Sequence, residues 1–190
     1  MPTALLALLT LALAAPLDLS RPAVGDAAPP LELETVDGKP FQKPQVTGTV
    51  TIVDFWATWC HPCHDAMRDL GTVRGALGPK VRLVFISVGE SPKVVRQFLR
   101  ENPLPEGAEV ALDRGGGTAR RWGEDGFPTT FIVDEGGIIR HINRGWGAGY
   151  QARVMKWVRA LMGTTGANGP GPGKGPAREV VRGVEVLRGG

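Results

Sequence analysis

The feature that most constrains this chain is its only pair of cysteines, Cys60 and Cys63, which lie three positions apart. A run of apolar residues typical of a buried strand precedes them, and a helical pattern follows. A strand that leads into a helix N-terminus places Cys60 beside unpaired backbone N–H groups and the positive end of the helix dipole. Both favour the thiolate, which is the species that attacks disulfides. The spacing therefore predicts a redox-active pair that exchanges disulfides.

Other roles for the cysteine pair stay open at this point. A purely structural disulfide between residues this close would remove little entropy from the unfolded chain. A zinc site needs about four ligands, and only three histidines could join the two cysteines. The C-x-x-C-H pattern of covalent haem attachment is also matched, by Cys60-His61-Pro62-Cys63-His64. An inert pair in a non-catalytic adaptor domain is the last alternative.

Pro62 favours the redox role over haem attachment. It lies just inside the expected helix start, where a missing N–H costs nothing and a fixed φ suits the first turn. We therefore predict that a redox-active disulfide between Cys60 and Cys63 serves in place of a bound cofactor, and we predict no metal site.

The N-terminal residues 1–16 are almost entirely apolar and contain an A-x-A-like cleavage site at Ala12-Leu13-Ala14. The stretch is shorter than the ~20 apolar residues of a membrane-spanning helix. No lysine or arginine precedes it, since the first basic side chain is Arg21. We predict a signal peptide and linker over residues 1–22, and export to the periplasm or cell envelope with the leader either cleaved or kept as an anchor. An oxidising compartment makes a lone cysteine pair a redox actor.

The composition suits one domain with appendages. The 190 residues are 42% apolar, which is enough for a real core. The net charge of +3 is dispersed along the chain and argues against a nucleic-acid partner. We predict a monomeric domain over residues 23–162, entered through a Pro-rich linker (16–30) whose loss should matter little. A tail over residues 163–190 is rich in glycine and proline, and we expect it to be flexible.

Strand and helix patterns alternate along the predicted domain. Apolar runs predict strands over residues 31–36, 49–57, 81–88, 109–112, 129–133 and 138–142. Helical spacing and capping signals predict helices over residues 60–77, 92–102, a short stretch near 121, and 151–162. This order, which closes on a β-hairpin and a terminal helix, predicts an α/β sheet with helices on both faces.

Two motifs resemble the thioredoxin superfamily. The active-site block of that superfamily is matched by residues 53–63, and its cis-proline loop by Gly126-Phe127-Pro128-Thr129. Residues 87–91 and the predicted hairpin over 31–38 are similar to exported thiol:disulfide oxidoreductases of the TlpA/ResA type. The resemblance covers about residues 29–162. It implies a thioredoxin fold, in which helices flank both faces of a central mixed β-sheet, with an extra N-terminal β-hairpin.

The resemblance implies catalytic roles for three residues. Cys60 would be the exposed nucleophile, and Cys63, one turn inside the helix, the buried resolving thiol. Asp54 is a polar residue in an apolar strand and is costly to bury. A raised pKa would let Asp54 accept the proton of Cys63, and a hydrogen-bonded structural carboxylate is the alternative.

The resemblance also implies a substrate-binding surface made of Trp59, Phe127, Pro128 and Thr129. Phe127 and Pro128 would be joined by a cis peptide bond beside Cys60 and would present backbone groups to an extended substrate segment. Trp59 would shield the rim of the site.

Two residues between the cysteines are expected to tune the redox potential in opposite directions. A His61 imidazolium would stabilise the thiolate, and with it the reduced form, and so make the disulfide more oxidising. Pro62 instead resembles the reducing members of the superfamily. We predict a reductant, and we expect His64 to lie on the surface.

The expected partners are disulfide-containing or dithiol proteins, together with a membrane electron-transfer partner that supplies electrons. One departure from the ResA pattern limits the substrates. Ala66 stands where members that serve cytochrome c maturation carry a glutamate, which argues against that role here. The chain keeps Asp54 instead, as ordinary thioredoxins do.

Overall fold

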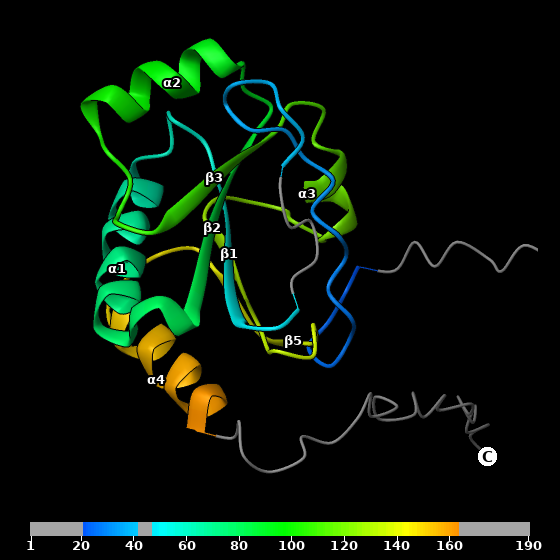
Figure 1. Ribbon diagram of the computed structural model, residues 1–190, viewed down its shortest axis with the longest axis vertical. Helices are drawn as coiled ribbons and strands as arrows, with labels where there is room; N and C mark the ends of the chain where they lie inside the picture. The colour runs from blue at the N-terminus through cyan, green and yellow to red at the C-terminus, as the bar shows by residue number, and fades with distance from the viewer. Residues whose placement is uncertain (1–20, 42–46, 164–190) are drawn as a thin grey trace, which may run out of the picture.

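The computed structural model describes residues 21–41 and 47–163. Residues 1–20 of the predicted signal peptide and linker lie outside this range, as do residues 164–190 of the predicted tail. The described residues form a five-stranded sheet with helices packed against it (Figure 1).

The sheet is mixed and has the strand order β3-β2-β1-β4-β5. β1 pairs in parallel with β2 and antiparallel with β4, so it occupies the centre of the sheet. Every residue of β1 is buried, because helices cover it on one side and other chain segments on the other. The strand bounds are Val50–Trp56 for β1, Val81–Val88 for β2, Ala108–Asp113 for β3, Thr129–Val133 for β4 and Ile139–Arg144 for β5.

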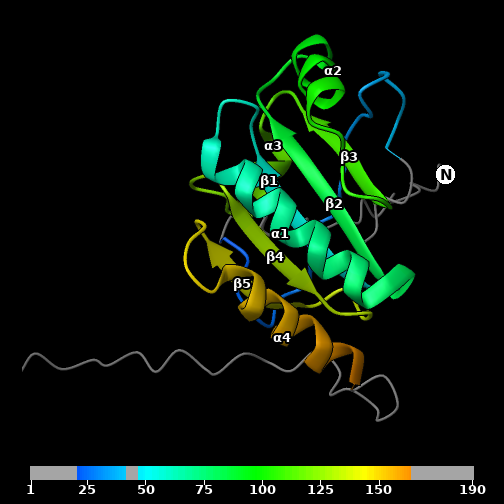
Figure 2. The ribbon, with the colours of Figure 1, turned by 90° about the vertical axis from the view of Figure 1, so that its left-hand side faces the viewer.

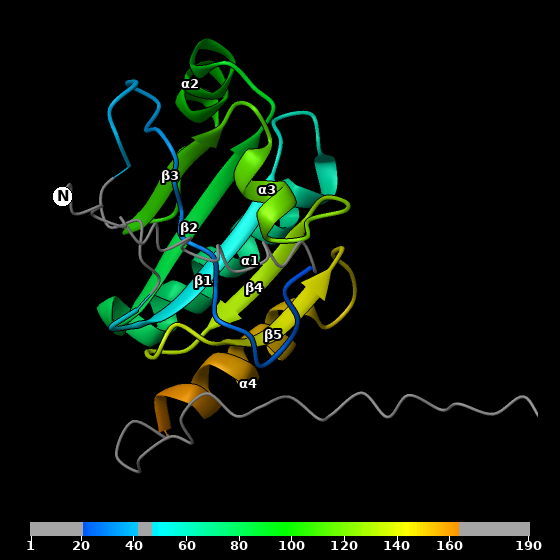
Figure 3. The ribbon, with the colours of Figure 1, turned by 90° about the vertical axis from the view of Figure 1, so that its right-hand side faces the viewer.

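Helices cover both faces of the sheet, as predicted. Figure 2 shows α1 (His61–Leu77) and α4 (Tyr150–Gly163) in front of one face, and Figure 3 shows the short α3 (Gly117–Arg121) over the other. The 3-10 turn Gly78–Lys80 follows α1. The hydroxyl of Ser91 caps α2 (Pro92–Glu101) by accepting from the backbone N–H of Val94 at 3.4 Å.

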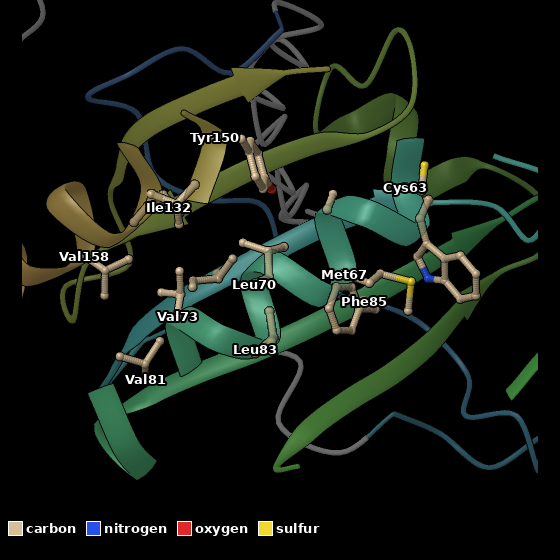
Figure 4. Packing of buried hydrophobic residues seen from close by; sticks show 14 of the residues in the cluster. Cys63, Met67, Leu70, Val73, Val81, Leu83, Phe85, Ile132, Tyr150 and Val158 are labelled. Carbon is tan, nitrogen blue, oxygen red and sulfur yellow. The ribbon is translucent and has the colours of Figure 1, made fainter. Parts of the chain in front are cut away.

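The face of the sheet under α1 holds the larger apolar cluster (Figure 4). Residues on one stripe of α1 point into it, as the helical spacing predicts. This stripe contains Cys63, Met67, Leu70 and Val73. Burying each large apolar side chain contributes about 1.5–3 kcal/mol. Cys63 is the first member of the stripe, so the packing of α1 fixes the cysteine pair against the sheet.

Residues 23–41, here called the N-terminal strap, lie across the face that carries α3 (Figure 3). The strap is bound to β5 at its start: the N–H of Gly25 donates to the carbonyl of Ile139 at 2.8 Å, and the N–H of Ile139 donates to the carbonyl of Asp26 at 2.9 Å. Leu31 and Leu33 are buried against the sheet. The predicted linker over residues 16–30 is described from residue 21 on, and this part is not a free linker, because the backbone of residues 25–28 pairs with the edge of the sheet at β5.

The predicted N-terminal hairpin is much reduced. Its turn forms, with the N–H of Thr35 donating to the carbonyl of Lys39 at 2.8 Å, but it contains only isolated bridges instead of strands. Glu34 bridges both Pro40 and Leu112 of β3. Leu31 and Leu33 alternate inward as a strand would, yet the segment bends over the core and meets β3 at a single position.

Candidate active site

The turn between β1 and α1 places the cysteines at the start of the helix. Cys60 is the N-cap residue of α1, with an extended backbone, and its N–H donates to the carbonyl of Ala57 at 3.1 Å. Pro62 follows inside the first turn, as predicted. No acidic residue lies in this first turn, so the helix dipole acts on Cys60 without an opposing local carboxylate.

Cys60 and Cys63 are joined by a disulfide with a sulfur–sulfur distance of 2.08 Å. Cys63 is completely buried, whereas Cys60 is 5% exposed and lines a groove of about 520 Å³. The expectation of an exposed Cys60 needs correction, because the residue is mostly buried and meets solvent only at this groove, whose lining it shares with Trp59 and Phe127. The difference between the two cysteines remains, since only Cys60 can be reached from solvent.

Two of the predicted substrate-binding residues line this groove. Trp59 is 67% exposed, and its ring lies 5.8 Å from that of Phe127 across the opening. The Phe127–Pro128 peptide bond is cis. Pro128 is buried, and its carbonyl accepts from the N–H of Gly145 at 2.7 Å. Thr129 is also buried and lies in β4 rather than in the groove.

Asp54 is fully buried in β1, on the face covered by α1 and α4. The hydroxyl of Thr130 donates to its Oδ1 at 2.7 Å. Its Oδ2 has no hydrogen-bond partner within the part of the chain that the structure describes. Burial raises the pKa of Asp54 to about 7, and the hydrogen bond from Thr130 partly opposes that rise. Such a carboxyl group can gain and lose a proton at neutral pH.

The two residues between the cysteines line the groove beside Cys60. His61 is the exposed first residue of α1, and Pro62 follows it, also exposed. A charge on His61 is therefore surrounded by solvent, which weakens its effect on the cysteine sulfur.

His64, expected on the surface, is half-buried and held by two contacts. Its Nε2 lies 2.9 Å from the carbonyl oxygen of Thr58, and its ring packs 4.8 Å from that of Phe98. A haem iron would need this ring as a ligand, and the backbone contact already engages its Nε2. The arrangement fits a structural histidine better than a haem ligand.

Glu90 is a site residue whose role the sequence did not reveal. Its carboxylate accepts from the backbone N–H of Thr58 at 2.9 Å, from the hydroxyl of Thr58 at 2.6 Å and from the hydroxyl of Ser87 at 2.7 Å. Gly89, with a φ of 75°, forms the turn that presents it. Glu90 therefore anchors the loop that carries Trp59 and Cys60. The only signal was the similarity of residues 87–91 to the TlpA/ResA type.

The acidic residues at the far side of the groove are Glu124 and Asp125. Asp125 accepts from Arg21 at 2.8 Å and from Arg144 at 2.6 Å. Burial raises the pKa of Glu124 above its usual value. Among the described residues, no group of three or more His, Cys, Asp or Glu side chains could hold a metal ion. None of the helices within residues 21–41 and 47–163 has the length and apolar character to cross a bilayer.

A mixed sheet of this order, with a C-x-x-C pair at the N-terminus of the helix after its central strand, defines a thiol–disulfide oxidoreductase of the thioredoxin superfamily. Comparison with known proteins agrees. The model of the AhpC/TSA family matches residues 24–142. The chain belongs to this family.

Of the individual relatives, one is named as thioredoxin-like and two as thiol–disulfide proteins. The thioredoxin-like protein YneN of Bacillus subtilis is 32% identical over 124 residues, which cover 64% of this chain and 71% of YneN. The thiol-disulfide oxidoreductase ResA of Geobacillus thermodenitrificans is 29% identical over 126 residues, which cover 65% of this chain and 70% of ResA. A solved thiol:disulfide interchange protein from Chlorobium tepidum is 27% identical with a TM-score of 0.57, covering 75% of this chain and 98% of its own.

Proposed function

We propose that this thiol–disulfide oxidoreductase reduces disulfides in exported proteins through Cys60 and Cys63. The observation that carries the proposal is the unequal burial of the two sulfurs at one helix N-terminus: Cys60 lines the groove, and Cys63 is enclosed behind it. A nucleophile must meet the substrate, whereas a resolving thiol only has to reach the nucleophile.

The reaction starts from the reduced pair. The Cys60 thiolate attacks one sulfur of a substrate disulfide, and the other substrate sulfur leaves as a thiolate that takes a proton from water. Cys63 then gives its proton to Asp54 and attacks the Cys60 sulfur, which leaves a Cys60–Cys63 disulfide and releases the second substrate sulfur as a thiolate. This thiolate takes a proton from water, and Asp54 returns its proton to the solvent. Two electrons pass to the substrate, and a dithiol donor must return them, for which we propose a membrane electron-transfer partner.

The direction of the reaction depends on what surrounds the pair. An ionised carboxylate at Asp54, on the face of β1 under α1, disfavours a thiolate above it and so disfavours the reduced form. The exposed position of His61 weakens the opposing influence. Both effects support a reductant. Export is supported by the apolar leader, and a cell-envelope location would explain the lone cysteine pair.

Substrate contacts follow from the groove. We propose that Trp59 and Phe127 contact the chain around the substrate disulfide, and that the backbone beside Pro128 orients it. The buried Thr129 would act only by supporting this loop, where its hydroxyl donates to the carbonyl of Gly126 at 2.6 Å.

The test combines two variants with a reduction potential. We expect Cys60→Ser to abolish insulin reduction and Cys63→Ser to accumulate mixed disulfides with protein substrates, because each variant stops a different step. The potential of the wild-type pair should lie near the ~−270 mV of thioredoxin. Full insulin reduction by Cys60→Ser would refute the mechanism, and a potential near the ~−120 mV of a strong periplasmic oxidant would reverse the direction.

A further inference from the structure

A chain of buried hydrogen bonds links Asp54 to two residues that the reaction scheme does not use. The hydroxyl of Thr130 lies 2.7 Å from Asp54 Oδ1 and 2.7 Å from the hydroxyl of Tyr150. Asp54 and Thr130 are opposite one another in β1 and β4, and Tyr150 is the first residue of α4. All three are essentially excluded from solvent. Figure 4 shows the Tyr150 side chain lying over the sheet near Ile132.

The two hydrogen bonds that link Tyr150, Thr130 and Asp54 run in one direction. A threonine hydroxyl has one proton, and Thr130 donates it to Asp54 Oδ1. The contact to Tyr150 must then be donated by the tyrosine hydroxyl, so protons point from Tyr150 to Thr130 to Asp54. Burial raises the pKa of Tyr150 far above its usual value, with the nearby Asp54 charge contributing, so the tyrosine keeps its proton throughout the working range. Because all three groups are buried, water cannot replace either bond.

These hydrogen bonds also place the two carboxylate oxygens of Asp54 in different surroundings. Oδ1 is held by Thr130, whereas Oδ2 has no hydrogen-bond partner among the residues described. A buried acceptor without a donor lowers the stability of the fold, so its presence calls for a functional explanation. Accepting a proton is such a function, and Oδ2 has free lone pairs that can receive one.

We propose that Thr130 and Tyr150 are positioning residues that hold Asp54 through Oδ1, so that Oδ2 receives the proton of Cys63. This inference rests on the proposed function, in which Cys63 loses a proton before it attacks the mixed disulfide. Thr130 and Tyr150 touch neither substrate nor sulfur in this scheme and act through Asp54 alone.

Other charged groups near the chain do not explain this arrangement. The charges that act on Tyr150 besides Asp54 are Asp69 of α1 and Arg153 of α4, which have opposite signs. Asp69 also accepts from the indole N–H of Trp146 at 2.9 Å, and Arg153 donates to Asn143 Oδ1 at 3.2 Å. On Asp54 itself, burial and the bond from Thr130 are the dominant influences.

The experiment measures Asp54 directly and then the step it serves. The protonation midpoint of Asp54 is followed by carbon NMR of its carboxyl group in the oxidised full chain, which needs no activity. Thr130→Val keeps the shape and removes the donor, and we expect the midpoint to rise by about one pH unit. Tyr150→Phe should raise it less, and Thr130→Ser should leave it near the wild-type value. The pH dependence of mixed-disulfide resolution should shift with the midpoint in each variant.

The control is Thr51→Val, because Thr51 is a buried threonine in β1, the strand of Asp54, and its hydroxyl donates to the backbone carbonyl of Thr49 at 3.2 Å instead of to Asp54. In Thr51→Val, the protonation midpoint of Asp54 and the pH dependence of mixed-disulfide resolution should match those of the wild type. An unchanged midpoint in both Thr130→Val and Tyr150→Phe would overturn the proposal, and so would a shifted midpoint with an unchanged rate profile. Should Thr130→Val not fold, Tyr150→Phe carries the test. Failure of the proposed function would be seen separately, because the wild-type protein would then resolve no mixed disulfide.

Discussion

Asp54 lies in a face of the sheet whose other members are mostly apolar, and this links its ionisation to the stability of the fold. Its pKa is about 7 in the folded chain against an ordinary value of 3.8. Between these two values the folded state holds a proton that the unfolded state has lost. Stability therefore falls as the pH rises from about 4 to about 7, and it levels off at higher pH, where both states are ionised.

Asp54→Asn should remove this pH dependence, because asparagine is neutral throughout and still accepts from Thr130. A displacement of about three pH units corresponds to about 4 kcal/mol, so the variant should exceed the wild type by up to that amount at pH 8 and match it near pH 4. Urea unfolding of the wild type and the variant between pH 4 and pH 8 measures the two free energies of unfolding. Glu106→Gln, at an exposed loop position, is the control. A wild-type chain whose stability rises between pH 4 and 7 would contradict the reasoning.

At the scale of elements, the loop from β1 to α1 depends on contacts from outside it. Thr58 sits in the middle of this loop, and its N–H, hydroxyl and carbonyl are all engaged, the first two by Glu90 and the third by His64. The two neighbours come from different elements, the turn after β2 and the first turn of α1. This arrangement fixes the backbone that leads into Cys60 without using the cysteine itself.

Glu90→Ala should loosen this loop, because it removes the acceptor for two donors of Thr58. We expect a loss of about 1–3 kcal/mol in unfolding free energy, together with slower insulin reduction. Hydrogen exchange gives the specific readout, since the amide of Thr58 should exchange faster while amides in the middle of β1 do not. Glu106→Ala provides a matched exposed glutamate. Wild-type protection of the Thr58 amide in the variant would show that Glu90 does not anchor the loop.

Sequence reasoning succeeded where the relevant signals lie close together. An apolar run, two cysteines and Pro62 sufficed to predict β1, the start of α1 and the chemistry between them. It failed where partners are distant in the chain. Glu90 and Thr58 are 32 residues apart, and Thr130 and Asp54 are 76 apart. Local periodicity shows which side chains are buried but not which distant donor or acceptor each polar group meets.

The N-terminal strap shows the same limit on a larger scale. The alternation of Leu31 and Leu33 correctly indicated burial, but nothing local indicated that Ala27 would bridge Ile138 or that Glu34 would bridge Leu112. The strap thus joins both edges of the sheet across the face that carries no redox chemistry. Its partners were unpredictable because edge pairing depends on the finished sheet.

For the whole molecule, the two faces of the sheet have separate tasks. The strap and α3 close one face. Helices α1, α2 and α4 close the other, which holds the cysteine pair, Asp54 and its hydrogen-bond chain. Forming the disulfide at the start of α1 is therefore coupled to the packing of one complete face. The redox state of two sulfurs should then change the stability of the entire domain.

The sign of that change reports the direction of the reaction. Folding and disulfide formation form a thermodynamic cycle. If the disulfide forms more readily in the folded chain than in the unfolded chain, the oxidised protein is more stable than the reduced protein. A reductant belongs to this class, whereas a strong oxidant has a stabilised reduced form. We expect the oxidised chain to unfold at higher urea concentration than the chain kept in dithiothreitol, with each 1.4 kcal/mol of difference equal to about 30 mV. The double variant Cys60→Ser, Cys63→Ser should be indifferent to dithiothreitol. A more stable reduced chain would make the protein a disulfide donor, with His61 outweighing the buried carboxylate.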